Sequence, residues 1–160
     1  MLYLFYQDLR YRAVYWFVFP ILFVLLSWYV LQLTAFDEVL INAAFNLGFF
    51  LMQLLLLSLY FSLKHKSLVN ITRQFLGWGD VLFLVCITVC LSPGNYMVFY
   101  IGSLILIAIP ALIVNKSTSQ QKIPLAGLQA LLFAGTLIAD WCSPAINLNS
   151  DNWILNYLNL

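Results

Sequence analysis

Charged residues are scarce in this chain of 160 residues. Lysine, arginine, aspartate and glutamate together make up 8% of it, whereas a soluble domain carries roughly 25% because it needs a polar surface. Hydrophobic residues make up 64%, which indicates that lipid is the solvent for most of the chain. The net charge is only +1 and there is no basic run, so the composition argues against nucleic acid as a partner.

Metal-binding patterns are also missing. The chain has three cysteines and one histidine, and none of the cysteines forms a CxxC pair of the zinc-binding type. Cys86 and Cys90 lie four residues apart, on one face of an expected helix, and Cys142 stands alone. Small apolar fillers are the better interpretation of all three, so we predict no metal and no cofactor.

Long apolar stretches follow one another with short connectors between them. A helix that crosses a bilayer needs about 20 mostly apolar residues. The candidate spans are residues 13–33, 41–63, 75–91, 96–114 and 123–141. The sequence therefore predicts an all-α fold, a polytopic transmembrane helix bundle of about five spans in a single domain over residues 1–160. Residues 143–160 form a tail that we expect on the outer surface.

The charges sort onto two sides of the membrane once the spans are counted. All lysines and arginines fall on one side, which the positive-inside rule assigns to the cytoplasm. They are Arg10, Arg12, Lys64, Lys66, Arg73, Lys116 and Lys122. The opposite side holds Asp37, Glu38, Asp140 and Asp151. Polar residues within the spans, such as Asn46 and Gln129, are expected to form hydrogen bonds between helices.

Two acids remain on the cytoplasmic side. Asp8 precedes the first span, and Asp80 follows Gly77-Trp78-Gly79 within the third. A carboxylate at membrane depth is energetically costly unless it is paired, protonated or exposed to water, so it is a functional candidate. The glycines also allow another backbone to approach closely, as a peptide substrate requires. The alternative is a helix-packing Gly-x-Gly with an acid at the loop edge that faces water.

Three segments resemble the type IV prepilin peptidases and preflagellin peptidases, which are GxGD intramembrane aspartyl proteases. Asp8-Leu9-Arg10-Tyr11-Arg12 is similar to the family's first-aspartate segment, and Gly77-Trp78-Gly79-Asp80 to its GxGD motif. Lys122-Ile123-Pro124-Leu125-Ala126-Gly127 resembles the Ile-Pro-rich opening of its last helix. The three segments come in the family's order and cover nearly the whole chain.

The resemblance implies an aspartyl endopeptidase of a bacterial or archaeal inner membrane, with its catalytic face toward the cytoplasm. Asp8 and Asp80 would be the catalytic residues, supported by Gly77, Gly79 and Pro124. The substrate would be a pilin-like precursor, whose leader is cut at the cytoplasmic edge of its apolar helix. Membrane lipid is the surrounding partner, and a second membrane protein is a further candidate partner.

The chain departs from the family pattern at several positions. Leu82 stands where the family usually has a lysine, and Val14 to Trp16 where it has Ile-Pro-Asn. The family's first aspartate normally closes a membrane helix, but only Met1 to Gln7 precede Asp8, which is enough for a short N-terminal half-helix. The larger members carry a zinc-binding cysteine loop and methyltransferase activity, and neither is predicted here.

Two other functions stay open at this point. The first is a catalytically inactive relative that serves as a membrane assembly partner. The second is a small transporter or channel component in which Asp80 is an ion or proton site within a glycine-broken helix. Two carboxylates that approach one another would favour the protease, whereas a continuous water path would favour the transporter.

Overall fold

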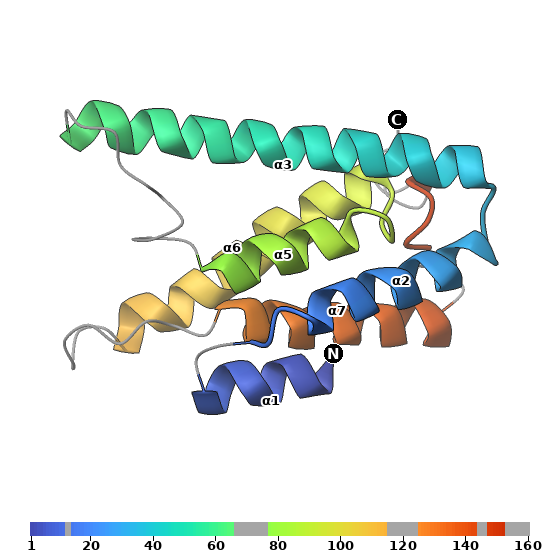
Figure 1. Cartoon of the computed structure of the whole chain (residues 1–160), viewed down its shortest axis with the longest axis horizontal. Coiled ribbons are helices and arrows are strands. Elements are labelled where there is room, and N and C mark those ends of the chain that lie inside the picture. The colour runs from blue at the N-terminus through green and yellow to red at the C-terminus, as the bar shows by residue number, and fades with distance from the viewer. Residues whose placement is uncertain (12–13, 66–76, 115–124, 144–146, 153–160) are drawn as a thin grey trace.

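A computed structural model describes residues 1–11, 14–65, 77–114, 125–143 and 147–152. Within these ranges the chain contains six helices and no strand, so the predicted all-α fold is confirmed. The helices are α1 (Leu2–Tyr11), α2 (Val18–Leu31), α3 (Phe36–His65), α5 (Trp78–Ile87), α6 (Pro93–Val114) and α7 (Leu125–Cys142) (Figure 1). Each of the five predicted spans overlaps one of the helices from α2 onward.

Only one helix in the described ranges is both long and apolar enough to cross a membrane by itself. It is α3, over Phe36–Tyr60, and only 17% of its most apolar stretch is buried. The apolar helical segments Val18–Leu31, Trp78–Ile87, Pro93–Ile107 and Ala126–Cys142 are shorter.

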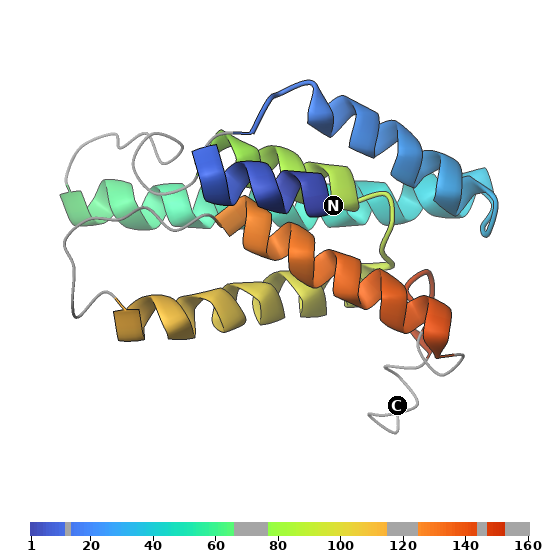
Figure 2. The ribbon, with the colours of Figure 1, turned by 90° about the horizontal axis from the view of Figure 1, so that it is seen from below.

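The helices form a bundle in which α5 occupies the middle. In Figure 1, α3 runs along one side, and α1, α2 and α7 lie on the other. Figure 2 shows α1 beside the N-terminal part of α7, and these two helices make the most extensive contact of the bundle. Helix α5 packs against both α2 and α7, while α3 packs mainly against α6. This arrangement brings the start of the chain against its last helix.

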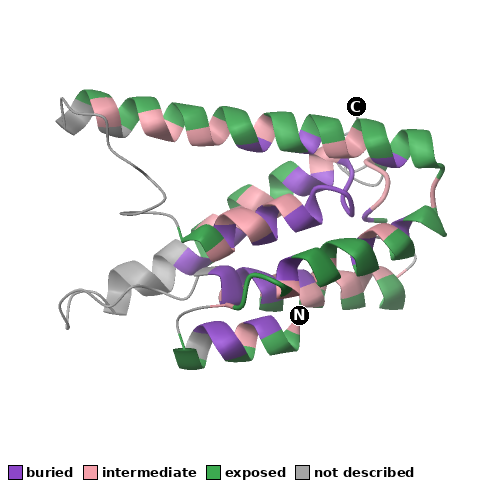
Figure 3. Ribbon diagram, in the orientation of Figure 1, coloured by how far each residue is buried: buried purple, intermediate pink, exposed green. Residues whose placement is uncertain are grey.

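The core is concentrated around α5 (Figure 3). Phe83, Leu84 and Ile87 are almost completely buried. Phe83 meets Phe133 of α7 edge to face, with ring centroids 6.2 Å apart. Such aromatic contacts add to the stabilisation gained by burying apolar area. Since α5 carries Asp80 in its first turn, the best-packed element of the fold also carries a candidate site residue.

Side chains from other helices hold the C-terminal end of α5. Asn46 of α3 donates hydrogen bonds to the carbonyls of Thr88 and Leu91, at 2.8 and 2.7 Å. Tyr96 of α6 donates to the Leu84 carbonyl at 3.3 Å. Carbonyls at a helix end lack partners within the helix, so these donors satisfy them. The predicted interhelical hydrogen bonding of Asn46 is thereby confirmed.

At the same end of the bundle, part of the predicted outer tail folds back onto the start of α6. Asp151 accepts hydrogen bonds from the Ser92 hydroxyl at 2.5 Å and from the backbone N–H groups of Gly94 and Asn95 at 3.1 and 3.2 Å. Asp140 accepts one from the Leu148 N–H at 3.0 Å. The two acids thus hold the tail and cap α6. Residues 153–160 of the predicted tail lie outside the described residues.

Candidate active site

Asp8 lies on the buried face of α1, a helix of ten residues. The buried side chains of α1 are Leu4, Gln7 and Asp8, which recur at the i, i+3, i+4 spacing of one helix face. The chain start expected as a half-helix is therefore helical, and it packs against α7. Asp8 is only 8% exposed, so it is not a solvated acid on a loose stub.

The Asp8 carboxylate binds the backbone at the start of α7. Its Oδ2 accepts a hydrogen bond from the Gly127 N–H at 2.6 Å. A Cβ atom at position 127 would lie 2.9 Å from the Asp8 Cβ and 3.3 Å from the Cα of Phe5. Real Cβ atoms essentially never show the first distance, and the second is tighter than nine in ten real Cβ contacts. Glycine is required here because α1 and α7 touch at this point.

Asp80, which lies on α5, also reaches the start of α7. Gly77 has extended backbone at φ −70° and ψ 147°, and α5 begins at the next residue. Asp80, in the first turn, accepts a hydrogen bond from the Gly77 N–H at 3.0 Å, as an acid at this helix position commonly does. The backbone N–H of Ala126, in α7, also lies close enough to interact with this carboxylate. Asp80 is also 8% exposed.

The two carboxylates therefore converge on consecutive N–H groups, those of Ala126 and Gly127. The first N–H groups of a helix have no partner within it and carry the positive end of the helix dipole, so this end attracts negative charge. Asp8 and Asp80 lie close enough for the charge of one to act on the other. Two acids 72 positions apart in the sequence thus share one end of one helix.

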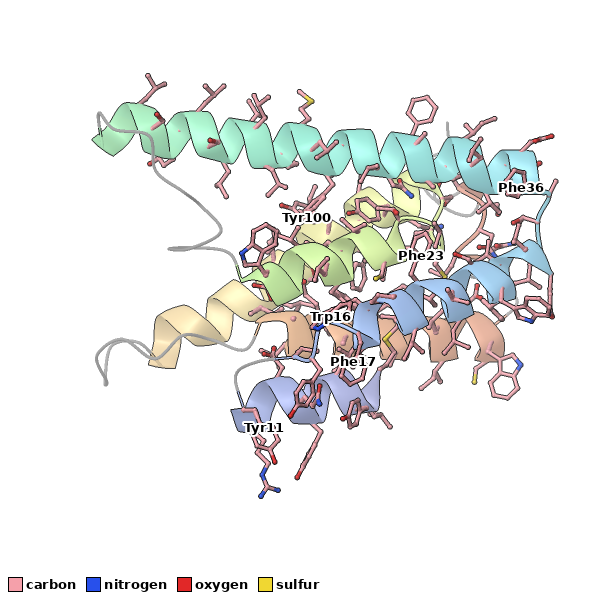
Figure 4. All side chains as sticks on the ribbon, in the orientation of Figure 1. Tyr11, Trp16, Phe17, Phe23, Phe36 and Tyr100 are labelled. Atoms are coloured by element: carbon pink, nitrogen blue, oxygen red, sulfur yellow. The ribbon has the colours of Figure 1, made fainter. Side chains whose placement is uncertain are left out.

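Burial acts on the protonation of Asp8. Loss of hydration raises the pKa of its carboxyl above the ordinary 3.8, and the hydrogen bond from Gly127 offsets part of that rise. Arg10 does not neutralise it, because its guanidinium binds the Tyr6 hydroxyl and lies over the rings of Tyr6 and Tyr11. Tyr11 points away from the other helices in Figure 4.

The remaining site residues predicted from the motifs have different places. Gly79 lies under α7, where an added Cβ would meet the Ala126 Cβ at 3.7 Å and the Phe19 ring at 3.8 Å, which are ordinary contacts. Pro124 lies outside the described residues. Gly127 ends the segment that resembles the opening of the family's last helix, but it was not predicted as a site residue, although a glycine so near the start of that helix was a signal for a close approach.

The cysteines take no part in this site. Cys86 and Cys90 are buried and Cys142 is exposed, all three as free thiols. Cys86 donates a weak hydrogen bond to the Phe19 carbonyl at 3.3 Å. No group of three histidine, cysteine, aspartate or glutamate side chains gathers in the part of the chain that the structure describes. The described site is one of carboxylates and backbone donors.

We predict that Gly127→Ala destabilises the protein by about 1–3 kcal/mol, the usual cost of overpacking. The new methyl group would push α1 away from α7, because the Phe5 backbone cannot rotate aside. Gly135→Ala, on the same helix with no atom within 4 Å of the added Cβ, is the matched control and should be neutral or stabilising. Thermal unfolding in detergent measures both, and equal effects would contradict the close contact.

A second prediction concerns pH. Because the pKa of Asp8 is raised in the folded state, the folded protein holds this proton more tightly than the unfolded chain. The resulting stabilisation is fully present below the unfolded value of 3.8 and is lost as the pH rises through the folded pKa.

The stability advantage of the wild type over Asp8→Asn should therefore shrink over a range that begins at about pH 4 and runs upward. Unfolding midpoints across this range measure it. Asp37→Asn, which changes an exposed acid in the first turn of α3, controls for the loss of a charge. An advantage that grows with pH would contradict the sign of the shift.

Comparison with known proteins adds no relative: no protein-family model, curated protein or solved structure matches this chain. The resemblance to prepilin peptidases therefore rests on the three sequence segments alone. The function has to be argued from the geometry that Asp8, Asp80 and the start of α7 form together.

Proposed function

We propose that this protein is an intramembrane aspartyl endopeptidase of the prepilin-peptidase type, with Asp8 and Asp80 as its catalytic residues. One observation carries the proposal: two buried carboxylates from α1 and α5 meet on consecutive N–H groups of α7. An inactive assembly partner has no need to bury two acids together, since that arrangement costs stability.

The chemistry follows from the pair. Adjacent carboxylates hold one proton between them, because both cannot ionise comfortably. The ionised member takes a proton from a water molecule, and the water oxygen attacks the scissile carbonyl carbon. The protonated member gives its proton to the carbonyl oxygen. When the C–N bond breaks, the leaving amine takes a proton back from the pair.

The Asp8 carboxylate keeps capacity for this chemistry. Asp8 uses Oδ2 for its bond to Gly127, and its Oδ1 takes no hydrogen bond from any residue in the described ranges. The backbone donor therefore fixes the Asp8 carboxyl group without using both of its oxygens. Because the pair titrates as a unit, the base is whichever member is ionised when the substrate binds.

The surroundings proposed for this site are a multi-pass bundle in the inner membrane of a bacterium or archaeon. Helices α2, α3, α5, α6 and α7 would be its five crossing segments. Many large apolar side chains are exposed, as lipid contact requires. On α3 they include Phe45, Leu51, Met52, Leu55 and Leu59.

The ends of the helices fit an orientation in which the carboxylate pair faces the cytoplasm. The C-terminal ends of α1 and α3 and the N-terminal ends of α5 and α7 lie at one end of the bundle, the end with the carboxylate pair. The first turn of α3, with Asp37 and Glu38, lies at the other end. The end with the pair, where Arg10 lies in the last turn of α1, would face the cytoplasm, and there the pair would meet the leader of a pilin-like precursor.

Cleavage tests the catalytic proposal. Asp8→Asn and Asp80→Asn should each lower cleavage of a co-expressed pilin-like precursor at least 100-fold, the lower range of general acid–base catalysis. Asp37→Asn, far from the pair on the exposed start of α3, should cleave normally. Folded wild-type protein that leaves the precursor intact would favour the inactive assembly partner instead.

Labelling from outside the cell tests the orientation. Cys142 is exposed at the end of α7, so a membrane-impermeant maleimide should label it in intact cells, whereas buried Cys86 and Cys90 should not react. In Cys142→Ser the signal should vanish. A thiol introduced by Tyr11→Cys in that background should react only after permeabilisation, and labelling in intact cells would contradict the orientation.

A further inference from the structure

A buried amide beside Asp8 has an acceptor that nothing in the described chain uses. Gln7 is 3% exposed. Its Nε2 donates a hydrogen bond to the Tyr3 hydroxyl at 2.8 Å, but its Oε1 is fully buried and has no partner among the described residues. Buried polar atoms are nearly always paired, so an unpaired one needs a reason.

The position of Gln7 relates it to the carboxylate pair. Gln7 and Asp8 share the buried face of α1 that packs on α7. Neighbouring side chains on a helix do not face one another, so the amide flanks the Asp8 carboxylate and is not its hydrogen-bond partner. The bond to Tyr3 holds the Nε2 end of the amide, so Oε1 is the end that can accept a further hydrogen bond.

A peptide bound at the pair would bring the missing donor. An extended chain advances about 3.3 Å per residue, so the backbone next to the scissile bond passes within a few ångströms of the carboxylates. Its N–H groups lose water on entering a buried site and then need acceptors. Gln7 Oε1, one residue from Asp8 on the same buried helix face, is an unused acceptor of the right kind.

We propose that Gln7 is a substrate-binding residue, whose Oε1 accepts a hydrogen bond from a backbone N–H of the peptide one or two residues from the scissile bond. This inference rests on the proposed protease function and deepens it. Recognition through the peptide backbone selects an extended segment and is independent of the side chain at that position. It adds affinity without taking part in the chemical step.

A second buried glutamine provides a matched control. Gln129 is fully buried, its Nε2 donates to the Ser103 hydroxyl of α6 at 3.3 Å, and its Oε1 is also unpaired in the described residues. It faces α6, whereas Gly127 on the same helix faces α1 and Asp8. The two glutamines therefore match in burial and chemistry and differ in which neighbour they meet.

The test is the kinetics of purified wild type, Gln7→Met and Gln129→Met on a pilin-like precursor. Gln7→Met should raise KM about 5- to 10-fold, which is what one hydrogen bond supports, and leave kcat within about twofold, as expected for uniform binding. Its thermal midpoint should be unchanged or higher, because an unpaired buried acceptor is removed. Gln129→Met should leave KM unchanged.

Ester replacements in the substrate give an independent readout. Each backbone N–H within two residues of the scissile bond is replaced in turn by an ester oxygen. One replacement should raise KM for the wild type and have little further effect in Gln7→Met, since both changes remove the same hydrogen bond. Additive losses at every position would overturn the assignment of Gln7.

The outcomes separate the two proposals. If the wild type cleaves and Gln7→Met keeps the wild-type KM, Gln7 does not bind substrate but the protease function stands. A lower thermal midpoint with unchanged KM would make Gln7 a packing residue only. If folded wild type does not cleave and does not bind the precursor, the proposed function fails, and the assignment of Gln7 fails with it.

Discussion

The start of α7 is the constraint on which the rest of the arrangement depends. A helix begins with N–H groups that have no partner in the helix, and two buried carboxylates need donors for the same reason that those donors need acceptors. Ala126 and Gly127 meet Asp80 and Asp8, so each requirement satisfies the other. These contacts attach α1 to the bundle and fix the first turn of α5.

The opposite end of the bundle supports this geometry. Asn46 and Tyr96 bind the carbonyls near the end of α5, so α5 is held at both ends and its well-packed middle lies between α2 and α7. A site built on elements fixed in this way keeps its groups in place better than one built on loops. The tail held by Asp151 caps α6, which in turn carries Tyr96.

Much of this could be predicted from the sequence, and the limits have physical reasons. Apolar stretches locate helices because burial in lipid or protein follows composition. Asp80 can be recognised as a candidate because a carboxylate within an apolar stretch has a high desolvation cost. The contact of Gly127 with Asp8 spans 119 positions, and no local pattern encodes it. The cap by Asp151 was missed for the same reason. In an asparagine-rich tail, the local sequence around an acid that caps a helix looks the same as that around an acid that faces water. Leu82 and the short start argued for inactivity, yet α1 is helical and buries Asp8.

Backbone donors give the pair a property that side-chain donors would not. The N–H groups of Ala126 and Gly127 are fixed by the helix itself, about 1.5 Å apart along its axis, and neither has a rotamer to choose. The relative position of the two carboxylates therefore follows from the register of α7 against α1 and α5. Close packing at Gly127 sets that register, because only glycine lets the Asp8 Cβ come so close to the α7 backbone. A glycine with no reactive group thus determines whether two acids from distant parts of the chain act as one site.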